Sequence, residues 1–130
     1  MQLTSPDYVI LIVENLQRSL LFYTEVLGLR LGHRSGDYAQ LDTGTTRLSL
    51  YTRKDMAKTL GMALEAPPLS APGFEIGFKV ADVDGAFGEL VARGGVPVVA
   101  PTDRLWGQRT AYIRDPDGHL IELAQDKKPK

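Results

Sequence analysis

The chain contains one structural unit twice, and this internal repeat restricts its fold more than any other feature. An apolar stretch at Tyr8–Val13 leads to Asn15, a residue that can cap a helix, and then to apolar residues three and four positions apart. The same order returns at Glu75–Val80 and Asp82. One constant offset aligns Val13 with Val80, Asn15 with Asp82, Leu16 with Val83, Leu20 with Phe87, and Gly28 with Gly95. The prediction is a chain made of two similar modules.

Each module continues with three expected strands, which gives a β-α-β-β-β order. The last two strands of each module flank turn-forming residues, Asp42–Thr45 in the first module and Asp115–Gly118 in the second. The expected strands after the two helices are Arg30–His33, Tyr38–Leu41, Arg47–Tyr51, Val96–Val99, Arg109–Arg114 and Leu120–Ala124. This pattern predicts an α+β fold of two tandem βαβββ modules, whose curved mixed sheets carry the helices outside and surround a cleft.

The length favours a single domain, because 130 residues suit one hydrophobic core. Module one is expected at about 8–51 and module two at about 74–124. The connector between them, 52–73, contains three prolines and has room for a short helix at Asp55–Leu64.

Composition excludes several classes of protein. With 15 basic against 16 acidic residues, and basic residues clustered only at 126–130, nothing indicates a nucleic-acid surface. No apolar run approaches the roughly 18 residues of a membrane span and the first residues do not form a signal peptide, so we expect a cytoplasmic protein. The chain has no cysteine, hence no disulfide and no thiolate nucleophile, and its two histidines exclude a three-histidine metal site.

Strand alternation predicts which side chains point into the cleft, because side chains switch faces at every residue. In the first module the inward set includes Tyr8, Ser49 and Tyr51, and in the second it includes Glu75 and Glu122. The repeat aligns Tyr8 with Glu75 and Ser49 with Glu122. Two carboxylates are therefore expected to face one cavity, without a carboxylate or imidazole at the equivalent positions.

Three stretches of the chain carry a family resemblance. They are Val13–Leu29, Val80–Val83, and the run from Trp106–Arg109 to Asp115–Glu122. From Tyr8 to Ala124 the chain resembles the vicinal oxygen chelate superfamily, also called the glyoxalase/bleomycin-resistance/dioxygenase superfamily. The resemblance implies paired βαβββ modules around a cleft that is commonly completed across a homodimer.

For the metal-dependent enzymes of that family, the resemblance implies ligands on the first and last strand of each module. Carried over, those positions are Tyr8, Ser49, Glu75 and Glu122. Only the two glutamates are good ligands, and they suit a hard divalent ion such as magnesium or manganese. One interpretation is therefore a metal-dependent glyoxalase I-like lyase or isomerase, or a dioxygenase-related enzyme, in which the ion polarises adjacent oxygens.

The other interpretation needs no metal or other cofactor. Resistance proteins that resemble this chain bind a drug instead, and they carry a run similar to Trp106–Arg109 beside the groove. An indole offers a planar face for stacking, and inward carboxylates favour a cation. The ligand-binding residues are expected to be Trp106, Tyr8, Tyr51, Ser49, Arg109 and Tyr38, together with Glu75 and Glu122. The expected function is binding of a planar, cationic, antibiotic-like small molecule by a homodimer, and a metabolite-binding domain that signals through a partner is a third interpretation.

Structural roles remain open for some of these side chains. Glu122 could simply pair with Lys79 or Arg47 inside the groove. Arg109 could hold an anionic group in a bidentate manner, or it could pair with Asp115.

The polar run before the last strand predicts a turn rather than a binding motif. In Asp115–Gly118, Pro116 fixes φ and Gly118 accepts a positive φ. His119 is then expected to be solvated at the start of the strand, and His33 is expected in a surface loop.

Overall fold

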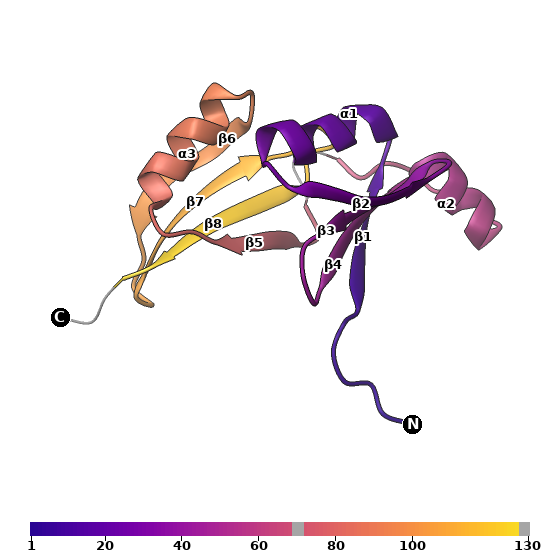
Figure 1. The fold of residues 1–130 in the computed structure, drawn as a ribbon, viewed down its shortest axis with the longest axis horizontal. Coiled ribbons are helices and arrows are strands. Elements are labelled where there is room, and N and C mark those ends of the chain that lie inside the picture. Colours follow the sequence, from indigo (N-terminus) through magenta and orange to yellow (C-terminus); the bar gives the residue numbers. More distant parts are fainter. Residues whose placement is uncertain (69–71, 128–130) are drawn as a thin grey trace. The chain divides into compact units, whose positions relative to one another are not determined.

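The computed structural model describes residues 1–68 and 72–127, and the chain divides into two compact units, Met1–Ala66 and Pro67–Lys130. Each unit contains one of the two repeats (Figure 1). The α+β fold of two tandem βαβββ modules is confirmed, and each module has one four-stranded mixed sheet. Within the expected connector 52–73, residues 69–71 lie outside the described part of the chain. The shared cleft stays a prediction.

The first unit is a sheet in the order β1-β4-β3-β2. Its elements are β1 (Tyr8–Val13), α1 (Leu16–Leu21), the π-helical turn η1 (Phe22–Val26), β2 (Arg30–Ser35), β3 (Tyr38–Asp42), β4 (Arg47–Thr52) and α2 (Arg53–Leu60). β1 pairs with β4 in parallel, whereas β3 pairs with β4 and β2 in antiparallel fashion. β4 lies between β1 and β3. Its parallel pairing with β1 needs a long crossover connection, whereas the antiparallel pairing of β3 with β4 needs only a short hairpin turn.

The second unit repeats this topology with the order β5-β8-β7-β6. Its elements are β5 (Glu75–Lys79), α3 (Val83–Ala92), β6 (Val96–Asp103), β7 (Gln108–Arg114) and β8 (Leu120–Asp126). β5 pairs with β8 in parallel, and β7 pairs with β8 and β6 in antiparallel fashion. β6 is longer than the expected Val96–Val99, and two register irregularities interrupt its pairing with β7.

The expected helix caps are both present. The side chain of Asn15 accepts a hydrogen bond from the backbone N–H of Arg18 at 2.9 Å, and Asp82 accepts one from Gly85 at 3.2 Å. Each bond satisfies one of the free amides of the first helical turn. After η1 the chain leaves the helix through Gly28, whose φ of 77° is in the left-handed region that favours glycine.

The helix in the connector begins and ends earlier than the expected Asp55–Leu64. α2 starts at Arg53, immediately after β4, because the hydroxyl of Thr52 accepts a hydrogen bond from the N–H of Asp55 at 3.3 Å. Gly61 ends it with a φ of 70°. Within residues 1–68 and 72–127, no helix has the length and apolarity needed to cross a bilayer.

Each sheet has one face covered by helix, and strand alternation predicts that face correctly. Leu11, Val13 and Leu50 are fully buried in the first unit, and so are Ile113 and Ile121 in the second, where α3 contacts β6, β7 and β8. Full burial of such a side chain stabilises a fold by about 1.5–3 kcal/mol. The alternate side chains of the same strands form the face that the helices leave open, and this face positions the candidate site.

Candidate functional site

The open face of the second sheet carries a hydrogen-bonded phenol and two carboxylates. Tyr112 on β7 lies opposite Glu122 on β8, and Gly77 on β5 lies on the other side of Glu122. The phenolic O–H of Tyr112 donates to Oε2 of Glu122 at 2.6 Å. A Cβ at position 77 would lie 3.4 Å from Oε1 of Glu122, so glycine leaves that side of the carboxylate uncovered. We call Glu75, Glu122 and Tyr112 the acidic cluster.

The electrostatics of the acidic cluster favour a positive charge nearby. Partial burial raises the pKa of Glu75, and the neighbouring charge of Glu122 raises it further. Both effects disfavour the ionised form, because the carboxylate loses hydration and faces a like charge. The bond to Glu122 and partial burial likewise raise the pKa of Tyr112. A cation close to Glu75 would favour the ionised form that burial and Glu122 disfavour.

Trp106 lies at the tip of the hairpin between β6 and β7. Gly107, with a φ of 90°, allows the tight turn that the N–H of Arg104 closes by donating to the carbonyl of Gln108 at 2.7 Å. The indole N–H of Trp106 donates to Oε1 of Gln108 at 2.9 Å, and Gln108 in turn donates to Asp126 at 2.9 Å. Although these bonds fix its orientation, Trp106 is 64% exposed. Its ring is thus held in place with much of its surface accessible to a ligand.

Arg104 links the indole to the acidic cluster. Its guanidinium carbon lies 5.9 Å from the ring centroid of Trp106 and 5.9 Å from that of Tyr112. Its Nε donates to Oγ1 of Thr110, a fully buried residue of the same open face, at 2.8 Å. A cation over an aromatic face within about 6 Å is attracted by the ring quadrupole. The described residues therefore place Trp106, Arg104, Tyr112 and Glu122 in one continuous chain of contacts.

The open face of the first sheet gathers three of the expected ligand-binding residues. The hydroxyl groups of Tyr38 and Ser49 are hydrogen-bonded at 3.0 Å, and Ser49 is fully buried. The rings of Tyr38 and Tyr51 meet edge to face at 6.0 Å, and the hydroxyl of Tyr51 is bonded to that of Thr59 at 3.1 Å. Tyr8, at the start of β1, is 55% exposed. A ligand-binding role for these four residues stays a prediction.

Arg109 faces the helix side of its sheet, and of the two roles considered for it the pairing with Asp115 is wrong. Its guanidinium donates to both carboxylate oxygens of Asp84 on α3, at 2.8 and 2.9 Å, and to Asp103 at 3.2 Å. Alternation explains this, because Thr110 occupies the open face and its neighbour must point to α3. These bonds lower the pKa of Asp84. The role of Arg109 as an anchor for an anionic ligand stays a prediction.

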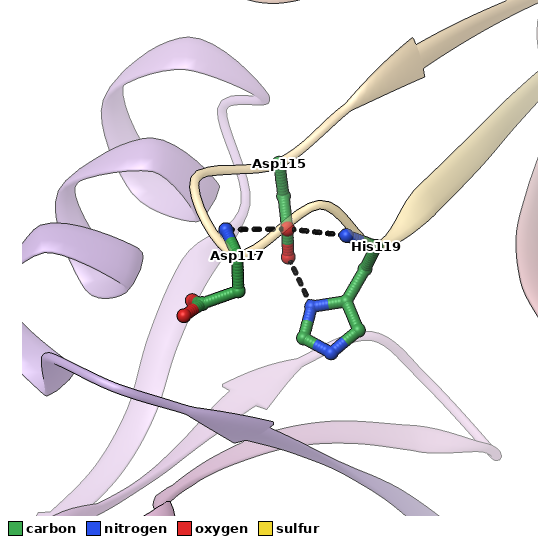
Figure 2. A group of neighbouring side chains, drawn as sticks. All are labelled: Asp115, Asp117 and His119. Atoms are coloured by element: carbon green, nitrogen blue, oxygen red, sulfur yellow. Dashed lines mark hydrogen bonds and ion pairs between the residues drawn. The ribbon is translucent and has the colours of Figure 1, made fainter. Parts of the chain in front are cut away.

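The turn before β8 is confirmed, and His119 is part of it (Figure 2). Oδ1 of Asp115 accepts from the backbone N–H groups of Asp117 at 2.9 Å and His119 at 2.8 Å, while Oδ2 lies 2.7 Å from Nδ1 of His119. The expectation of a solvated His119 is therefore wrong, since its side chain is only 18% exposed. His33 is exposed as expected, but on strand β2 rather than in a loop.

Asp115, Asp117 and His119 also bring their ligand atoms within 4.8 Å of one another, a spacing that could hold a metal ion. The hydrogen bonds of Asp115 give it a structural role instead. Its carboxylate is buried and satisfies two amides of the turn. Buried polar groups of this kind commonly serve to close a turn.

The four metal positions that the family resemblance implies do not fit a divalent ion. Ser49 offers a hydroxyl that is already bonded to Tyr38, and Tyr8 offers a phenol. Of the two glutamates, Glu122 accepts the hydrogen of Tyr112. Hydroxyl and phenol groups are poor ligands beside the carboxylates and imidazoles that divalent ions usually take.

Glu122 is bonded to Tyr112 and not to Lys79 or Arg47, the two partners suggested by strand alternation. Lys79 pairs with Asp126, and Arg47 pairs with Asp7. Tyr112 could have been found from the turn, because it and Glu122 lie at equal distances along the chain from Asp117. No comparable signal indicates Arg104, whose position depends on the irregular pairing of β6.

The chain is similar to known proteins over most of its length. A family model described as "Glyoxalase/Bleomycin resistance protein/Dioxygenase superfamily" matches residues 5–123. The uncharacterized protein YraH of Bacillus subtilis (strain 168) is 36% identical over 119 residues, which cover 87% of this chain and 91% of YraH. An uncharacterized protein of Mycolicibacterium smegmatis is 37% identical over 113 residues, covering 85% of this chain and 84% of that protein.

Solved structures show the same fold. A glyoxalase/bleomycin resistance protein/dioxygenase from Nocardioides superposes with a TM-score of 0.86 at 23% identity, covering 100% of this chain and 88% of that one. TioX from Micromonospora sp. ML1 superposes with a TM-score of 0.70 at 27% identity, covering 95% of this chain and 99% of TioX.

Proposed function

The chain belongs to the glyoxalase/bleomycin resistance protein/dioxygenase superfamily, and we propose that it is a metal-independent binding protein of the bleomycin-resistance type. Its ligand is a planar, cationic small molecule, and the site is the open face of the second sheet. The observation that carries the proposal is the acidic cluster of Glu75, Glu122 and Tyr112, which Arg104 links to the accessible ring of Trp106.

The charge of the ligand is inferred from the acidic cluster. Partial burial and the neighbouring charge of Glu122 both disfavour the ionised form of Glu75 and raise its pKa. A cation placed near the two glutamates gains Coulombic energy from both carboxylates. A neutral ligand of the same shape does not gain this energy, so charge should dominate selectivity.

The shape of the ligand is inferred from the aromatic rings. Trp106 and Tyr112 both contact the Arg104 guanidinium, which is itself a planar cation. Aromatic stacking adds about 0.5–1.5 kcal/mol beyond the area buried. A flat, delocalised cation can stack on the rings and also interact with the carboxylates. A compact ammonium group interacts mainly with the carboxylates.

The test uses the single tryptophan of the chain as reporter. Benzamidine is a planar cation and benzamide is its neutral counterpart of nearly equal shape. We expect a saturable change of Trp106 fluorescence with benzamidine and with planar cationic antibiotics, and at least tenfold weaker binding of benzamide. The proposal is wrong if no planar cation changes the fluorescence, or if benzamide binds equally well. Repeating the titration after dialysis against a chelator checks metal independence, since we expect no change in affinity.

A homodimer is part of the same proposal and is supported by the family resemblance. Light scattering after gel filtration tests it, and we expect twice the mass of the chain. A monomer at micromolar concentration would contradict the homodimer without affecting the site on the second sheet.

A further inference from the structure

We propose that the guanidinium of Arg104 occupies the position that the cationic group of the ligand takes, so that Arg104 is an internal competitor and the site selects guanidinium and amidinium cations. This inference rests on the function proposed above and names its ligand class. It comes from the contacts of Arg104 within the second unit alone.

The contacts of Arg104 are those of a bound cation. Its guanidinium carbon is 5.9 Å from the ring centroids of both Trp106 and Tyr112, and its Nε donates to Thr110 at 2.8 Å. Guanidinium groups suit such a site because they are planar, stack on aromatic faces and donate hydrogen bonds in their plane. An external guanidinium or amidinium group presents the same features.

Arg104 is also free to leave. Among residues 1–68 and 72–127 it has no carboxylate partner within ion-pair distance, in contrast to Arg109, which is held by Asp84 and Asp103. Its side chain is only partly buried. The backbone of the hairpin is fixed by the bond from the Arg104 N–H to Gln108, so the side chain can rotate away without opening the turn. Displacement therefore breaks one hydrogen bond and two cation–π contacts.

Departure of Arg104 would uncover a ready set of partners. These are two aromatic faces, the hydroxyl of Thr110 and, next to Tyr112, the carboxylate of Glu122. A ligand that joins an amidinium to an aromatic ring can use all of them. The Arg104 side chain has no aromatic ring of its own. A ligand that carries one gains additional stacking energy and can therefore displace Arg104.

The fraction of time that Arg104 occupies the site determines how much it weakens ligand binding. If the site is free of Arg104 only about one tenth of the time, the apparent affinity of a ligand is reduced about tenfold. Replacing Arg104 by an uncharged side chain removes that reduction. A tenfold change in affinity corresponds to about 1.4 kcal/mol.

The experiment compares benzamidine binding to the wild-type protein and to Arg104→Gln, with Arg104→Lys as the matched control that keeps the charge. We expect Arg104→Gln to bind about tenfold more tightly and Arg104→Lys to lie between. Without ligand, acrylamide should quench Trp106 more strongly in Arg104→Gln, because the guanidinium no longer covers the ring. Arg104→Met is a second uncharged variant, for use if Arg104→Gln does not fold.

The outcomes separate this inference from the proposed function. Equal or weaker binding of benzamidine to both uncharged variants overturns the inference, while the function stands. An equal gain for benzamide also overturns it, since it would show removal of bulk rather than of a competing charge. If neither the wild-type protein nor the variants bind any planar cation, the proposed function and the inference fail together.

Discussion

Tyr112 donates its hydroxyl hydrogen to Glu122 across 2.6 Å on the open face of the second sheet. The bond joins two strands and fixes both the ring that contacts Arg104 and the carboxylate that faces the proposed ligand. Tyr112 thus stabilises the sheet through its hydroxyl and contributes to the proposed site through its ring. Separate substitutions can test these two roles.

Tyr112→Phe removes the hydroxyl and keeps the ring. Hydrogen bonds to charged groups contribute about 1.5–3 kcal/mol, and we expect a loss near the lower end because Tyr112 is only half-buried. Urea unfolding measures that loss. Benzamidine affinity should change less than threefold, whereas Tyr112→Leu should weaken it further by removing the ring. Equal affinities of the Phe and Leu variants would contradict the stacking role.

Glu75→Gln should stabilise the protein at neutral pH. Because the pKa of Glu75 is raised in the folded state, folding favours its protonated form, and the associated stability is lost as the pH rises through that raised value. The Tm gain of Glu75→Gln over the wild-type protein should therefore be larger at pH 7 than at pH 3.5, where the carboxyl is protonated in both states. Glu25→Gln, on the surface of the other unit, is the control. A gain that does not depend on pH would contradict this account.

Asp115 should be the most sensitive residue of the turn before β8. Asp115→Ala leaves two turn amides without their acceptor in a buried position, which costs about 1–3 kcal/mol. Asp115→Asn keeps one side-chain oxygen and should lose less. Thermal unfolding of the two variants tests the difference, and a loss of bound metal without a loss of stability would show instead that the cluster with Asp117 and His119 is a metal site.

The two helix caps should be equivalent, as the repeat predicts. Asn15→Ala and Asp82→Ala each remove one bond to a free helical amide, and each should cost about 1 kcal/mol. Hydrogen exchange can assign each loss to its own unit. If the two losses in free energy of unfolding differ more than threefold, the two caps do not stabilise their helices equally despite their aligned positions.

The internal repeat and the alternation of side chains along a strand are visible in the sequence. The structural features that follow from these two patterns could therefore be predicted. The caps, the turn at Asp115–Gly118 and the buried faces of β1 and β8 all belong to this group. The caps and the turn depend on residues close together in the chain. The buried faces follow because alternate residues of a strand all point to the same side of the sheet. The open positions of Glu75 and Glu122 were predicted in this way.

The rest of the site depends on long-range register, which the sequence does not display. The regular pairing of β7 with β8 settles the face of Arg109, but its partners Asp84 on α3 and Asp103 on β6 come from elements whose positions the sequence does not display. Arg104 follows the end of β6 directly, and no local pattern of the sequence predicts its bond to Thr110. His119 was misjudged for a different reason, because its partner Asp115 is buried by the tertiary packing of the turn.

A map of backbone and indole N–H chemical shifts during titration with benzamidine tests most directly whether the ligand binds on the open face of the second sheet. We expect the largest shifts at the indole of Trp106, at Tyr112 and along Leu120–Ala124, with saturation at one affinity. Shifts confined to Met1–Ala66, or centred on Asp84 and Arg109 at the helix side of the second sheet, would contradict this expectation.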